Sequence, residues 1–142
     1  MKNVFLFITT LLSCQILFAQ DTSVLKRAPY RLVLAVDKET TFEEQINETP
    51  YLYPNRSMQM YPGETVFLEV ELSGTDIVSM KAVKEITKIS STLTLKFVQN
   101  AENGIHKSMM LTVQNPFPLQ LEYQAMIFPF KAKKFVNTDV YP

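Results

Sequence analysis

Short runs in which apolar and polar side chains alternate recur along this 142-residue chain. In the run 66–72, Val66, Leu68 and Val70 alternate with Glu69 and Glu71. Successive side chains of a β-strand point to opposite faces, so each run places one face in a core and the other in water. The runs occupy 30–36, 66–72, 92–97, 108–114 and 119–127, and the last of them alternates most regularly.

Turn-forming residues separate these runs. Pro62-Gly63 precedes the run 66–72, and Gly74, Gly104 and Asn115-Pro116 stand between later runs. Several short alternating strands joined by such turns predict an all-β, antiparallel sandwich. An immunoglobulin-like β-sandwich is the best-fitting architecture, although the chain lacks both tryptophan and a core disulfide.

Two segments are less regular. In 77–86 an apolar residue recurs at every third position, beginning with Ile77, Met80 and Val83. This spacing fits either one stripe of a helix or a strand with a bulge, and the abundance of β-branched residues favours the strand. The segment 38–60 contains Pro50 and Pro54 and reads as a long loop with room for one edge strand.

The first residues have the pattern of a secretory signal peptide. A positively charged start at Lys2 precedes a largely apolar run from Val4 to Phe18, and Ala19 supplies a small residue before the sequence turns polar. We expect residues 1–19 to be the signal peptide and residues 20–142 to form a single domain. The mature chain has no other apolar stretch of about 18 residues, so no transmembrane segment is expected in it.

Cys14 leaves a second possibility open. Leu11-Leu12-Ser13-Cys14 resembles a lipobox, in which the cysteine would be lipidated and would anchor the protein. However, Ile16, Leu17 and Phe18 continue the apolar core beyond it, which favours ordinary cleavage after residue 19 or 20. In both cases the folded domain has no thiol chemistry, because Cys14 is the chain's one cysteine.

Composition excludes several function classes. Fourteen basic and fourteen acidic residues give a net charge of zero, so a nucleic-acid partner has no electrostatic basis. The chain has three glycines, and they cannot form a phosphate-binding glycine-rich loop. No cofactor is expected.

A set of motifs near the C-terminus is similar to a known kind of protein. Met109-Met110-Leu111-x-Val113-x-Asn115-Pro116-Phe117 precedes Leu121-x-Tyr123-x-Ala125-Met126. This pattern resembles small exported bacterial β-sandwich proteins of uncharacterised function. The resemblance covers roughly residues 60–130 and implies strands and a turn, but no catalytic residues.

Aromatic side chains in and around the segment 38–60 are the candidate binding residues. Rings carried by loops can stack on sugars or bury against a protein partner. The same rings could instead cap an open end of the sandwich. The candidates are Phe42, Tyr51, Tyr53 and Tyr61.

Methionine and histidine give a second, weaker hypothesis. Thioether and imidazole groups suit monovalent copper, although methionine also fills gaps in cores. The ligands would be Met58, Met60, His106 and Met110. The lone His106 has no nucleophile motif beside it, and Glu69 and Glu71 have the spacing of an ordinary solvated strand face.

Taken together, the sequence predicts an exported, non-catalytic structural or binding module of the bacterial cell envelope. It would lie in the periplasm or outside the cell and act on an unknown protein or glycan partner. A periplasmic copper-binding protein is the alternative. The chain ends where another strand would be expected, so an edge strand could also pair with a partner.

Overall fold

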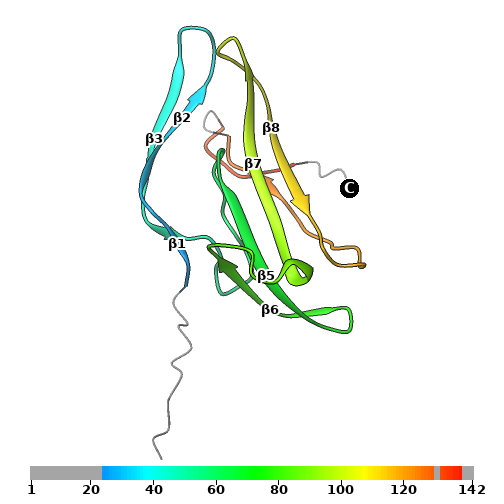
Figure 1. The fold of residues 1–142 in the computed structure, drawn as a ribbon. Coiled ribbons are helices and arrows are strands. Elements are labelled where there is room, and N and C mark those ends of the chain that lie inside the picture. The colour runs from blue at the N-terminus through cyan, green and yellow to red at the C-terminus, as the bar shows by residue number, and fades with distance from the viewer. Residues whose placement is uncertain (1–23, 130–131, 139–142) are drawn as a thin grey trace, which may run out of the picture.

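The computed structural model describes residues 24–129 and 132–138, which form an all-β fold without an α-helix (Figure 1). The all-β class predicted from the alternating runs is confirmed. The elements are β1 (Lys26–Arg27), β2 (Tyr30–Ala35), β3 (Thr41–Ile46), β4 (Thr49–Pro50), β5 (Thr65–Ser73), β6 (Asp76–Val83), the short 3-10 helix η1 (Ile89–Ser91), β7 (Thr92–Glu102), β8 (Ile105–Gln114), β9 (Met126–Ile127) and β10 (Val136–Asn137).

The largest sheet has four antiparallel strands in the order β6-β5-β7-β8. Two tight hairpins build it. Asn103 and Gly104 connect β7 to β8 with φ angles of 51° and 77°, as a type I′ turn requires at both central positions. Asparagine followed by glycine is the residue pair that adopts this turn most readily, so the sequence itself specifies the hairpin.

The hydrophobic core lies on one face of this sheet. Leu68 and the neighbouring alternate residues of β5 are buried, and they pack with alternate residues of β7. The faces predicted for the runs 66–72 and 92–97 are therefore confirmed. The buried cluster consists of Val66, Leu68, Val70, Leu93 and Leu95.

The ambiguous segment 77–86 is a strand with a bulge. In the pairing of β5 with β6, Glu71 faces Ser79 and Leu72 faces Ile77, so Val78 has no partner. This extra residue shifts the alternation by one position, and Ile77 and Met80 therefore both pack against the core. The three-residue spacing of apolar residues in the sequence is therefore due to the bulge and not to a helix. The strand ends at Val83.

Among the described residues, the other sheets have two strands each, and the side chains that cover the core from outside the large sheet come from irregular segments. Tyr51, Met58 and Met60 pack against it from one connection, and Phe117 and Leu121 from another. The prediction of a strand throughout 119–127 is wrong, because only Met126–Ile127 forms a strand, paired with β10. Leu119, Leu121, Ala125 and Ile127 of the predicted face are partly buried, but Tyr123 on the same face is 46% exposed. The alternation thus identified most of the buried positions, but a strand also needs a hydrogen-bonded neighbour. The immunoglobulin-like topology stays a prediction.

The hairpin of β2 and β3 is a separate sheet, and its tip lies beside the tip of the β7–β8 hairpin (Figure 1). The segment 38–60 contains the six-residue strand β3 and the two-residue strand β4 in addition to loops, so it has one strand more than predicted. Gln99 of β7 joins the two hairpins. Its amide nitrogen donates to the carbonyl of Ala35 at 2.8 Å, and its carbonyl oxygen accepts from the Ala35 N–H at 2.9 Å.

The expectation that Glu69 lies on a solvated strand face is wrong. Glu69 is only 5% exposed, whereas Glu71 is exposed. The Nζ atom of Lys88 lies 2.6 Å from its carboxylate and that of Lys81 lies 3.3 Å away. The hydrogen bond from Lys88 is the main reason that the pKa of Glu69 lies below its ordinary value. The turn before β7 thus covers this face of the central strand.

The predicted signal peptide, 1–19, and the alternative lipidation site at Cys14 lie outside the described residues. Within the part that the structure describes, no helix is long and apolar enough to cross a membrane.

Candidate functional site

The buried side chain of Arg27 organises the clearest polar cluster in the described structure. Arg27 lies in β1, opposite Thr49 of β4, and is only 1% exposed. Its Nε donates to Oε1 of Glu64 at 2.8 Å, and Nη2 donates to the carbonyl oxygen of Gln59 at 2.6 Å. Nη1 donates to Oγ1 of Thr49. Because the guanidinium is paired and hydrogen-bonded, its burial does not leave an uncompensated charge.

Two tyrosine rings pack against the same guanidinium. The Cζ atom of Arg27 lies 4.7 Å from the ring centroid of Tyr51 and 4.9 Å from that of Tyr61. Both distances are within the range in which a cation is attracted to an aromatic face. Arg27 therefore ties the N-terminal strand to both ends of the connection 51–61.

A tight turn places Glu64 in this cluster. Gly63 adopts a φ of 98°, which favours glycine, and the Glu64 N–H donates to the carbonyl of Tyr61 at 3.1 Å. The carboxylate accepts the Tyr61 N–H at 2.8 Å, and Oη of Tyr30 lies 3.4 Å from Oε1. Hydrogen bonds from the turn and from neighbouring strands thus fix both the guanidinium of Arg27 and the carboxylate of Glu64.

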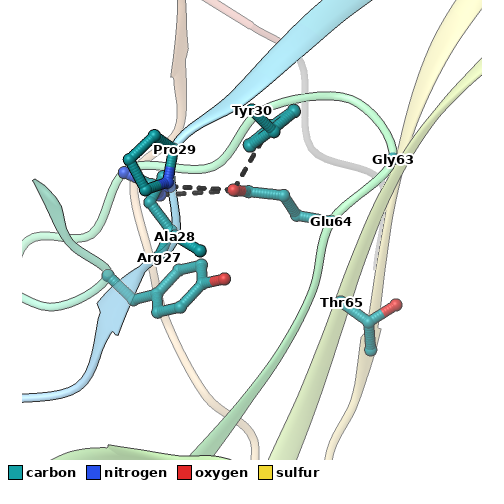
Figure 2. A pocket seen from close by; sticks show the side chains of 8 residues that line it. Arg27, Ala28, Pro29, Tyr30, Gly63, Glu64 and Thr65 are labelled. Carbon is teal, nitrogen blue, oxygen red and sulfur yellow. Dashed lines mark hydrogen bonds and ion pairs between the residues drawn. The ribbon is translucent and has the colours of Figure 1, made fainter. Parts of the chain in front are cut away.

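A hollow of about 410 Å³ opens beside the ion pair. Figure 2 shows Ala28 and Pro29 on one side of it, Tyr30 next to the Glu64 carboxylate, and Thr65 on the strand that follows. Tyr30, Tyr51 and Thr65, three residues that carry hydroxyl groups, are among those that line it. Since Arg27 and Glu64 neutralise each other, the walls carry no net charge.

The tyrosine hydroxyls of the cluster keep their protons to high pH. Burial raises the pKa of Tyr30, Tyr51 and Tyr61 above the ordinary value, and the negative charge of Glu64 adds to the effect. The positive charge of Arg27 opposes it only in part. Tyrosine hydroxyls are neutral near pH 7 in any case, and these three stay protonated to higher pH than exposed ones.

We expect a spectrophotometric pH titration of the native protein to show this effect. Part of the tyrosinate absorbance should appear only well above pH ~10. Because unfolded tyrosines ionise first, stability should fall as the pH rises from the ordinary tyrosine value towards the raised ones. The Tyr30→Phe variant should lose the part of the curve at the highest pH. A single ordinary transition for all tyrosines of the folded protein would contradict the assignment.

The structure gathers three of the four predicted aromatic residues. Tyr51 and Tyr61 pack on Arg27, and the Gln59 side chain joins Tyr61 Oη at 2.9 Å and Tyr53 Oη at 3.4 Å. Of these three, Tyr51 alone lines the hollow. Phe42 lies in β3 opposite Leu34 and is not part of the hollow.

The predicted copper ligands occupy different parts of the fold. Met58 and Met60 pack against the hydrophobic core. His106 and Met110 lie in β8, where Nδ1 of His106 is 2.9 Å from the Gln99 amide. Among residues 24–129 and 132–138, no group of three or more His, Cys, Asp or Glu side chains could hold a metal ion.

Sequence reasoning missed Arg27, Glu64 and Tyr30. Arg27 and Glu64 are separated by 37 positions, and neither belongs to a recognisable motif. The one local signal was the Pro62-Gly63 turn, which positions Glu64. Comparisons of the chain with models of protein families, with curated proteins and with solved structures find no match.

Proposed function

We propose that this protein is an exported, non-catalytic binding module of the bacterial cell envelope, periplasmic or extracellular, that holds a neutral sugar unit of a glycan. The tyrosine-lined hollow beside the closed Arg27–Glu64 pair is the observation that carries this proposal. The signal-peptide pattern at residues 1–19 and the resemblance to small exported bacterial proteins support the location.

The chemistry of the hollow favours a neutral, hydroxyl-rich ligand. Its volume of about 410 Å³ lies within the range of about 300–1,000 Å³ found for small-molecule sites. Aromatic rings pack against the C–H faces of a sugar, and neutral hydroxyls exchange hydrogen bonds with its hydroxyl groups. A charged ligand would gain little, because the nearest charges already neutralise each other.

The same contacts argue for binding without catalysis. A general acid or base must be able to exchange a proton with its substrate near the working pH. The Glu64 carboxylate is occupied by Arg27, by the N–H of Tyr61 and by Tyr30. Tyrosine hydroxyls are protonated near pH 7, and the raised pKa values of these tyrosines move their ionisation further from it.

Calorimetric titration with neutral sugars tests the proposal. The probes are glucose, galactose, mannose and N-acetylglucosamine with their short oligosaccharides, and an oligogalacturonate serves as the charged comparison. Ala28 is exposed and lines the hollow, so Ala28→Trp should block it and weaken binding at least tenfold while the protein stays folded. The matched control is Ala132→Trp, at another exposed alanine outside the hollow, which should bind as the natural protein does. If none of the neutral probes binds, or if Ala28→Trp binds as tightly as Ala132→Trp, the proposal is wrong.

A further inference from the structure

The outer edge of β8 is free over most of its length among the described residues. β8 ends the sheet order and is hydrogen-bonded to β7 on its inner side. On the outer side, the described backbone contact is near the hairpin tip, where the His106 N–H donates to the carbonyl of Val36 at 3.3 Å. Lys107 then forms a bulge, because Ala101 faces His106 and Asn100 faces Ser108. The run Ser108–Gln114 begins directly after this bulge.

The composition of this run differs from that of the opposite edge of the sheet. Ser108-Met109-Met110-Leu111-Thr112-Val113-Gln114 contains no charge, no proline and no glycine. The β6 edge carries a bulge at Val78 and the exposed Lys81, which are features that keep other strands from pairing. The β8 edge has its bulge and its exposed lysine at Lys107, directly before the run. The run itself lacks these protections, and an unprotected edge is a template for another strand.

Two apolar side chains of the run are exposed. Met110 is 50% exposed and Leu111 is 36% exposed. Leu111 faces Phe97 and Val113 faces Leu95, so Leu111 lies on the same side of the sheet as the core. The core face therefore continues to the edge of the sheet and stops there without full cover.

We propose that this run pairs antiparallel with the same run of a second copy of the chain, with a two-fold axis at Leu111. The two four-stranded sheets then continue into one another. The inference is independent of the proposed glycan site, because residues 108–114 do not line the hollow.

The axis is placed at Leu111 because it is the midpoint of the run, so that all seven residues from Ser108 to Gln114 pair with their counterparts. With the axis at Leu111, Met109 faces Val113 of the second copy and Met110 faces Thr112, so core-side residues meet core-side residues. Ser108 faces Gln114, and Lys107 faces Asn115 rather than another lysine. A shift that pairs odd with even positions would place the two cores on opposite faces of the joined sheet. In this register the core-side faces match, and no like charges oppose one another within the run.

Charge placed on the axis provides the test, measured by sedimentation velocity on the full mature chain. Leu111→Lys and Leu111→Glu each place like charges directly opposite one another, and each variant alone should be monomeric. A mixture of the two should form dimers again, because the opposed charges then attract. Val78→Lys, the same kind of change at the exposed bulge of the other edge, should leave the dimer intact.

Hydrogen exchange of the unmodified protein gives a readout that needs no variant. Amides of 108–114 that point away from β7 should exchange slowly in concentrated solution and faster on dilution. A natural protein that is monomeric throughout, exchange that is independent of concentration, or a lysine–glutamate mixture that stays monomeric would each overturn the proposal.

Discussion

Replacing Arg27 with methionine should lower the free energy of unfolding by about 3–5 kcal/mol. The substitution keeps much of the side-chain volume but leaves the buried Glu64 carboxylate without its cation. It also removes the packing of the guanidinium on Tyr51 and Tyr61 and the hydrogen bond to the Gln59 carbonyl. Urea unfolding followed by circular dichroism measures the change.

The neighbouring residue provides a matched control. Lys26 pairs with Glu48 at 2.9 Å, but both side chains are more than half exposed. Lys26→Met should therefore change stability by no more than about 1 kcal/mol. The double variant Arg27→Met/Glu64→Gln should be more stable than Arg27→Met alone, because the unpaired charge is removed. Equal losses for Arg27→Met and Lys26→Met would refute the structural role of the buried pair.

Leu68→Ala should cost about 2–5 kcal/mol of unfolding free energy. Leu68 is among the largest fully buried side chains, and it lies in β5, between β6 and β7. Strands on both sides restrict the movement that could fill the resulting cavity, so a value in the upper half of this range is expected. The urea midpoint should fall without a large change in the m-value.

A matched aliphatic truncation separates burial from strand propensity. Val33 lies in β2 and is exposed, so Val33→Ala should remain within about 0.5 kcal/mol of the natural protein. If the two truncations cost the same, β5 would not be the centre of the core.

The alternating runs predicted the faces of strands more reliably than the strands themselves. In 66–72 and 92–97 the predicted face is the core, and the strands are present. In 119–127 the predicted face is partly buried except at the exposed Tyr123, but backbone pairing is limited to Met126–Ile127. At Glu69 the predicted face is wrong. This polar residue was expected to be solvated, but it is buried because Lys88 and the turn that carries it cover it.

The candidate site was predictable only in part. Tyr51, Tyr53 and Tyr61 are close in sequence and do gather, because one short connection carries them. The charged pair that gathers them was not predictable, since Arg27 belongs to a two-residue strand far from Glu64 along the chain. Long-range ion pairs leave no periodic or motif signal in a single sequence.

The sequence by itself therefore determined the all-β class, the buried faces of the main strands and the Asn103-Gly104 hairpin. Each of these depends on interactions between residues that are close along the chain, and so each leaves a local pattern. The tertiary structure alone decided the burial of Arg27 with Glu64 and the exposure of the β8 edge. Both features depend on which segments, distant along the chain, come into contact in the fold. The buried ion pair is stable only because Glu64 and the carbonyl of Gln59 reach Arg27 there.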